Sequence, residues 1–140
     1  MTDHIFMLDT NILSDLVRNP RGHVQQELRR HGINAVCMSA IAVSEIRFGL
    51  AKKNSEEFAD RVEAALSRIA LLDYGDDATF AYASIRNDLQ SRGTSIGTTD
   101  LFIAAHAKSL DLTLVTNNIR EFSRVDGLKV ENWLEEEDSQ

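Results

Sequence analysis

The stretch Ile5-Phe6-Met7-Leu8-Asp9-Thr10-Asn11 decides the fold of this chain. Its first four residues are large and apolar, and such a run is typical of a strand that is buried on both faces. Strands of this kind belong to parallel sheets that are covered by helices. Asp9 follows at the C-terminal end of the strand, which is the edge where ligands bind in open α/β sheets. We therefore expect Asp9 to be the first member of an active site, with later acidic residues as its companions.

Length and composition indicate one globular domain. The chain has 140 residues, of which 43% are hydrophobic and 26% are charged, and a chain of this size can bury a genuine core. We assign residues 1–134 to the domain and residues 135–140 to a solvated acidic tail. No apolar run approaches the roughly 18 residues that span a bilayer, the N-terminus lacks the basic flank of a signal peptide, and the single cysteine allows no internal disulfide. These features predict a cytoplasmic protein with no membrane partner.

The charge balance is acidic. The chain has 22 acidic and 15 basic residues, for a net charge of −7. This balance argues against a protein that holds nucleic acid by charge alone. It does not exclude a nuclease, because carboxylates gathered around a metal ion become favourable once the cation is bound.

Apolar runs and helical periodicities alternate along the chain. Strands are predicted at 5–8, 35–38, 70–74 and 112–115, with an edge strand at 128–130. Helices are predicted at 10–17, 23–30, 40–52, 55–68, 76–92 and 97–107, with a helical turn at 120–122. This alternation predicts an α/β fold with a mainly parallel central sheet that is flanked by helices on both sides.

Some details of packing and capping can also be predicted. Thr10 or Asn11 is expected to cap the first helix, and Trp133 is expected to anchor the end of the domain. His106 and Cys37 are expected to be core residues, because no second His or Cys lies at the spacing of a metal ligand. The expected packing residues of helix 76–92 are Phe80, Ala83, Ile85 and Leu89.

Glu45 is an anomaly in its predicted helix. Ile41, Glu45 and Phe48 share one helical face, so a carboxylate lies on a stripe with two large apolar residues. An ionised carboxylate is costly to bury without compensation, and a metal site would compensate it. The alternative is a glutamate at the edge of the helix that pairs with Arg47 or a later basic residue.

Four polar side chains are expected to converge at one edge of the sheet. Asp9 and Asn118 each follow a buried strand, Glu45 lies on the helix after the second strand, and Asp100 opens the most apolar helix. Asp100 could also serve only as a helix N-terminal acid. Carboxylates this close repel unless cations are bound, and Mg²⁺ suits them because it takes oxygen ligands. Such a site suits phosphodiester hydrolysis, with Thr116 orienting a carboxylate.

Four segments resemble a known family. They are MLDTNILSDL at 7–16, SAIAVSEIRFGL at 39–50, IGTTDLFIAAHA at 96–107 and LVTNNIREFSRV at 114–125. In their order and spacing they resemble PIN-domain ribonucleases, and most closely the VapC toxins of VapBC toxin–antitoxin systems. The resemblance implies a PIN-like domain with metal-dependent endoribonuclease activity that inhibits translation.

The resemblance also implies the site. The acidic positions of the family fall on Asp9, Glu45 and Asp100, and its fourth position, often aspartate, falls on Asn118. Asp9 and Asp100 are the expected ligands of Mg²⁺ or Mn²⁺, with Glu45 and Asn118 as further ligands, directly or through water. The supporting polar positions of the family fall on Asn11 and Thr116. Asparagine at 118 removes one negative ligand, which argues against a tightly bound second metal.

Partners are implied in the same way. The resemblance implies a cognate VapB-type antitoxin, a homodimer, and an RNA substrate such as the anticodon loop of initiator tRNA. Contacts to RNA would come from local basic residues, although each is more commonly a solvated surface charge. These candidates are Arg47, Lys52, Lys53, Arg86 and Arg92.

Three other functions compete with a nuclease. A phosphatase with an aspartyl nucleophile is disfavoured, because an Asp-x-Asp pair would require an aspartate where Asn11 stands. A receiver domain is disfavoured because its clustered acids should follow the first strand. The remaining alternative is a non-catalytic PIN-fold module that binds nucleic acid or protein. Divalent-dependent activity that is lost in Asp9→Asn would distinguish the enzyme from this module.

Overall fold

The computed structural model describes residues 4–134, so the predicted acidic tail at 135–140 lies outside the described residues. Its five strands form one sheet in the order β3-β2-β1-β4-β5, and every neighbouring pair is parallel. The prediction of an α/β fold is confirmed, and the sheet is entirely rather than mainly parallel. The strands are β1 (Phe6–Leu8), β2 (Val36–Ser39), β3 (Ala70–Leu72), β4 (Thr113–Val115) and β5 (Val130–Glu131).

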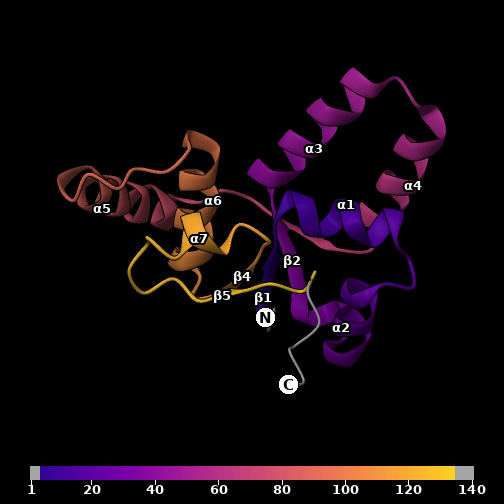
Figure 1. The fold of residues 1–140 in the computed structure, drawn as a ribbon, viewed down its shortest axis with the longest axis horizontal. Helices are drawn as coiled ribbons and strands as arrows, with labels where there is room; N and C mark the ends of the chain where they lie inside the picture. Colours follow the sequence, from indigo (N-terminus) through magenta and orange to yellow (C-terminus); the bar gives the residue numbers. More distant parts are fainter. Residues whose placement is uncertain (1–3, 135–140) are drawn as a thin grey trace.

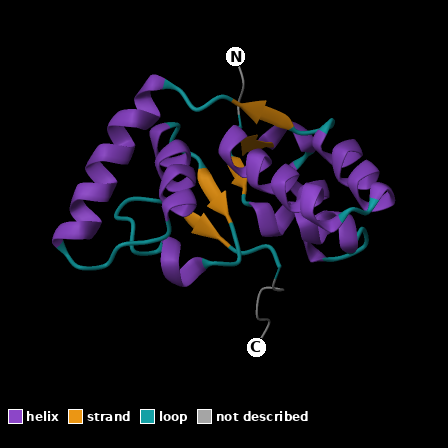
Figure 2. Ribbon diagram, turned by 90° about the horizontal axis from the view of Figure 1, so that it is seen from above, coloured by secondary structure: helices purple, strands orange, loops and turns teal. Residues whose placement is uncertain are grey.

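Helices cover both faces of the sheet (Figures 1 and 2). They are α1 (Thr10–Arg18), α2 (His23–His31), α3 (Ala40–Lys53), α4 (Glu56–Leu66), α5 (Asp76–Ser91), α6 (Thr98–Ser109) and α7 (Ile119–Phe122), with a short 3₁₀ helix at Ile33–Ala35. In Figure 1, α1 to α4 lie on one side of the strands and α5 to α7 on the other. Within residues 4–134, none of these helices combines the length and apolarity needed to cross a bilayer.

The strand order places a topological switch point between β1 and β4. From β1 the chain moves outward through β2 to β3, and it then returns across the sheet to β4 and β5. Since crossover connections are right-handed, the two directions of travel put their helices on opposite faces. The loops after β1 and β4 therefore diverge, and the crevice between them is where α/β sheets bind ligands. Asp9 follows β1 and Thr116 follows β4, so both lie at this crevice.

The central strands are buried as their apolar sequences predict, with one exception. Phe6, Met7 and Leu8 of β1 are 5% exposed or less, whereas Ile5 is 53% exposed. The prediction of a buried strand over 5–8 is therefore wrong by one residue. Phe6 is the first residue that pairs with both neighbouring strands, through Val36 and Thr113.

The packing face of α5 differs from the prediction at two positions. Ala78, Ile85 and Leu89 are buried and form its stripe against the domain. Phe80 is 71% exposed and Ala83 is also exposed. Both lie off the i, i+7, i+11 row that faces the core. Their position on the helix therefore leaves them exposed although they are apolar.

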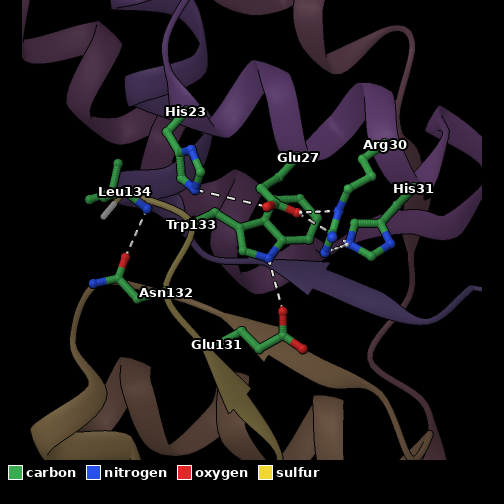
Figure 3. Close-up of polar contacts among 8 residues, drawn as sticks. All are labelled: His23, Glu27, Arg30, His31, Glu131, Asn132, Trp133 and Leu134. Atoms are coloured by element: carbon green, nitrogen blue, oxygen red, sulfur yellow. Dashed lines mark hydrogen bonds and ion pairs between the residues drawn. The ribbon is translucent and has the colours of Figure 1, made fainter. Parts of the chain in front are cut away.

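The end of the domain is anchored by Trp133, as predicted (Figure 3). Its side chain is 2% exposed, stacks on the His31 ring at 5.4 Å and meets Phe6 of β1 edge-on at 5.0 Å. The indole N–H donates to Glu131 Oε1 at 3.1 Å. Glu27 on α2 lies 3.3 Å from His31 Nε2 and so fixes the ring on which Trp133 stacks. The end of the described chain is thus held to β1 and α2.

We expect Trp133→Ala to lower the free energy of unfolding by about 3–5 kcal/mol, because it removes a buried aromatic side chain and leaves a cavity. Urea unfolding followed by circular dichroism would measure the loss. Phe80→Ala is the matched control and should change the stability by less than about 0.5 kcal/mol, since Phe80 is exposed. Equal losses in the two variants would contradict the anchoring role of Trp133.

Candidate functional site

Asp9 is a buried carboxylate at the end of β1. It is 4% exposed and is the N-cap of α1. Its Oδ1 accepts a hydrogen bond from the Thr10 backbone N–H at 2.8 Å. The prediction that Thr10 or Asn11 caps this helix is therefore wrong, because the carboxylate directly after the strand reaches the first free N–H. The site residue is also the residue that starts the helix.

Thr116 holds the other oxygen of Asp9. Its Oγ1 donates to Asp9 Oδ2 at 2.8 Å and accepts from the Asn118 backbone N–H at 3.0 Å. Thr116 is fully buried, so this bond is shielded from water. Burial raises the pKa of Asp9, and the hydrogen bonds from Thr10 and Thr116 oppose the rise. Thr116 therefore lies where it was predicted, orienting a carboxylate.

Asp100 and Glu121 form a carboxyl pair at the start of α6. Asp100 is half-buried in the first turn of this helix, and its carboxyl group hydrogen-bonds to that of Glu121. Glu121 Oε1 accepts from the Gly97 backbone N–H at 2.7 Å, and its Oε2 accepts from Asn118 Nδ2 at 2.8 Å. These donors lower the pKa of Glu121, the Gly97 N–H most of all. Glu121 is therefore the carboxyl group of the pair that ionises first as the pH rises.

The pKa of Asp100 is raised to about 6. Burial is the largest cause, followed by the negative charges of Glu121 and Asp9, the hydrogen bond to Glu121, and the charge of Glu45. Three carboxyl groups from three other segments of the chain therefore raise the pKa of Asp100. A site with this much uncompensated negative charge attracts a cation.

Glu121 is the site residue that the sequence analysis did not identify. The sequence signal was its position three residues after Asn118, which places both side chains on one face of the helical turn they open. Asn118 donates an amide hydrogen bond to Glu121. The carboxylate of Glu121 thus supplies a negative charge beside position 118, where asparagine has none. The role of Asn118 as a metal ligand remains a prediction.

Glu45 lies at the site but is not buried. The buried face of α3 consists of Ala42, Val43 and Ile46, and Glu45 and Phe48 face solvent. The prediction of a glutamate on a buried apolar stripe is therefore wrong, because, of its i, i+4, i+7 set, only Ile41 packs against the core, while Glu45 and Phe48 are exposed. The alternative partner, Arg47, pairs with Glu63 at 2.9 Å instead. Glu45 is free to act through its charge on Asp100.

Asn11 supports the loop that follows β4. Its Nδ2 donates to Asn117 Oδ1 at 3.0 Å, so it joins the first turn of α1 to the segment that carries Thr116 and Asn118. His106 and Cys37 are core residues, as predicted, at 1% and 0% exposure. His106 Nδ1 is hydrogen-bonded to Ser39 Oγ at 2.7 Å, and burial lowers the pKa of the imidazole.

The predicted RNA-binding cations have different surroundings. Arg47 is ion-paired with Glu63, and Arg92 is ion-paired with Asp88 at 2.7 Å. Arg86 Nη1 donates to Tyr82 Oη at 2.9 Å. Lys52 and Lys53 lie over the rings of Phe48 and Phe58.

The donor set fits a hard, oxygen-binding cation. Within residues 4–134, no group of three or more His, Cys, Asp or Glu side chains is placed so that it could hold a metal ion. Mg²⁺ does not need one, because it is commonly bound by one or two carboxylates and keeps several waters. The carboxylates of Asp9 and Asp100 meet that requirement, and the charges of Glu121 and Glu45 reinforce it.

Comparison with known proteins gives concordant matches. A family model described as PIN domain matches residues 6–128. Ribonuclease VapC2 of Rickettsia felis is 37% identical over 131 residues, which cover 92% of this chain and 98% of the relative. The tRNA(fMet)-specific endonuclease VapC of Salmonella typhimurium is 36% identical over 129 residues, with coverages of 91% and 97%. The crystal structure of DNA-bound VapBC from S. typhimurium has a TM-score of 0.87 at 36% identity, covering 93% of this chain and 98% of that one.

We expect Asp100→Asn to stabilise the metal-free protein above pH 6. Because the folded protein holds a proton on Asp100 that the unfolded chain releases, its stability falls as the pH rises from about 4 to about 6. The rise in pKa from 3.8 to about 6 corresponds to about 3 kcal/mol at full burial, and screening reduces it to about 1–2 kcal/mol at this half-exposed site.

Urea unfolding in a chelating buffer at several pH values would measure this effect. The advantage of Asp100→Asn should grow between pH 4 and pH 6 and remain constant above that. Asp77→Asn, at an exposed position in the first turn of α5, is the control. An advantage of the same size at every pH would show that the carboxyl pair does not carry the effect.

Proposed function

The chain belongs to the PIN-domain family and, within it, to the VapC ribonucleases, and from that premise we propose that it is a metal-dependent endoribonuclease. One observation carries the proposal. The carboxyl groups of Asp9 and Glu121, which are far from Asp100 in the sequence, lie near enough to raise its pKa at the switch point of the sheet. The reaction is hydrolysis of an RNA phosphodiester bond, which would inhibit translation.

The residues of the site have separable roles. Asp9 is held rigidly by Thr10 and Thr116, so its carboxylate presents fixed lone pairs toward the crevice. Asp100 is the second carboxylate for Mg²⁺ or Mn²⁺, and cation binding would offset the negative charges that raise its pKa. Glu45 supports the charge of the site from its exposed face, directly or through water. Mg²⁺, when bound, supplies Lewis-acid stabilisation of the charge that develops on the phosphodiester oxygens.

The proposed substrate is initiator tRNA. One relative with 36% identity over most of the chain is named a tRNA(fMet)-specific endonuclease, and this supports that tRNA as the target, while cleavage in its anticodon loop stays a prediction. Tight clustering of acids at the site, in a protein with a net charge of −7, requires cations to bind before a polyanion can approach. Both the substrate and the translation machinery are cytoplasmic, which supports a cytoplasmic location.

The proposed protein partner is a cognate VapB-type antitoxin. Solved relatives are VapBC complexes, and this chain has a groove of about 490 Å³ among α1, α2 and α4. Its lining includes the apolar side chains of Leu16, Val17 and Leu28 and the cationic side chains of Arg29, Arg61 and Arg68. An amphipathic helix with an acidic edge would complement such a groove. A homodimer remains a prediction, which light scattering would check.

We expect the purified protein, free of antitoxin, to cut a total tRNA pool into discrete fragments when Mg²⁺ is present. Chelation should abolish cleavage, because carboxylates without the cation repel the phosphate backbone. Asp9→Asn should lower the rate at least about 100-fold, because it removes a charged ligand but retains an N-cap. Gel electrophoresis with sequencing of the fragment ends would measure the activity and name the substrate.

Lys129→Gln, a change at an exposed residue that directly precedes β5 and is ion-paired with Asp111, is the control and should cleave like the wild type. Cleavage that persists in Asp9→Asn would refute the assigned site. An absence of cleavage with every RNA and every divalent metal would instead favour the non-catalytic binding module.

We expect Ala65→Arg to weaken antitoxin binding by about tenfold or more and to leave RNA cleavage unchanged. Ala65 lines the groove, so a long charged side chain would block an apolar helix there. Isothermal titration with the purified antitoxin would measure the affinity. Unchanged affinity would place the antitoxin elsewhere on the surface.

A further inference from the structure

A second cavity, lined by cations, lies among the C-terminal residues of α1 and α3 and the first half of α4. Its volume is about 370 Å³, and its lining residues are Arg18, Lys53, Ser55, Phe58 and Arg61. None of its three cations forms an ion pair with a carboxylate in the part of the chain that the structure describes. In a protein with a net charge of −7, three unpaired cations around one cavity form an electropositive pocket.

The cations are held in place by neutral groups. Arg18 Cζ and Lys53 Nζ each lie 5.4 Å from the centroid of the Phe58 ring. Arg61 Nη2 donates to the backbone carbonyl of Val17 at 2.5 Å. Like charges gathered around one space repel, and an anion in that space would relieve the repulsion. The chemistry of the pocket therefore calls for an anionic ligand.

An exposed row on α3 connects this pocket to the carboxylate site. Glu45, Phe48 and Lys52 follow one another at i, i+3 and i+7 on the solvent face of the helix. Phe48 is 61% exposed, and Lys52 Nζ lies 5.2 Å from its ring centroid. The row begins at Glu45, whose charge acts on Asp100, and ends beside Lys53.

The span from the site to the pocket is also bridged by α1. Asp9 caps its N-terminus, and Arg18 is its last residue. Nine helical residues rise about 14 Å, so the pocket lies a few nucleotides of extended strand away from the carboxylates. Both α1 and the exposed row on α3 therefore run from the carboxylate site to the pocket.

We propose that this pocket binds a backbone phosphate of the RNA strand that occupies the catalytic carboxylates, and that Phe48 stacks an unpaired base between them. The inference rests on the proposed ribonuclease function and adds the path of its substrate. Cations that track a backbone, interleaved with exposed aromatic rings, are the pattern of single-strand binding surfaces. An acidic peptide would satisfy the cations but would leave the exposed Phe48 without a planar partner.

The test measures binding of a fluorescein-labelled, single-stranded oligouridylate to the full chain by anisotropy at several salt concentrations. All proteins carry Asp9→Asn to prevent cleavage. Arg18→Gln and Lys53→Gln should each weaken binding and reduce the slope of log K against log salt by about 0.7, the value for one lost phosphate contact. Phe48→Ala should weaken binding by about five- to a hundredfold with no change in that slope.

Matched controls make the result decisive. Lys129→Gln removes an exposed cation outside the pocket, and Phe80→Ala removes an exposed phenylalanine from α5, so neither should change the affinity or the slope. Equal effects of Lys53→Gln and Lys129→Gln would overturn the inference. Lost antitoxin affinity in Arg18→Gln with unchanged RNA affinity would overturn it in favour of an acidic peptide. Failure of the nuclease itself is seen separately, as an absence of tRNA cleavage by the wild-type chain.

Discussion

The hydrogen bond from Thr116 to Asp9 is the interaction on which the site depends. It joins the ends of β1 and β4 across 107 positions of sequence, inside a fully shielded environment. Without it, a carboxylate at 4% exposure would have one oxygen buried without a partner, which is costly. Because Thr116 also accepts the Asn118 N–H, the same hydroxyl sets the path of the loop that leads to Glu121.

The sheet topology explains why such a bond can form at all. Only at the switch point do two adjacent parallel strands send their following segments in opposite directions, which leaves a crevice instead of a covered edge. The first turn of α6 completes the crevice, and the backbone N–H of Gly97, at the start of this helix, donates a hydrogen bond to Glu121. The carboxylates that accept hydrogen bonds from the N–H groups at the start of α1 and α6 are therefore also members of the proposed catalytic site.

The sequence predicted the strands, the helices and the edge of the sheet that carries the site, because these depend on local periodicity and on general rules of parallel sheets. The prediction of packing faces failed in helices where apolar residues recur at helical spacing on more than one face. Glu45 and Phe80 looked like members of packing faces, yet each lies about a quarter-turn or more from the buried row. Glu121 was missed for another reason. Its role depends on a backbone N–H that lies 24 residues away in sequence, and local spacing does not predict such contacts.

The distribution of charge reconciles an acidic protein with a polyanionic substrate. The carboxylates are concentrated at the crevice, where a cation can neutralise them. Many surface cations are cancelled by ion pairs, such as Arg47 with Glu63 and Arg92 with Asp88. Of the three unpaired cations around Phe58, Arg18 and Lys53 lie at the far ends of α1 and α3, and Arg61 lies on α4. In the proposed complex, affinity for the strand and chemistry on the strand therefore lie at opposite ends of α1, so a bound metal would have to balance only the phosphate that reacts.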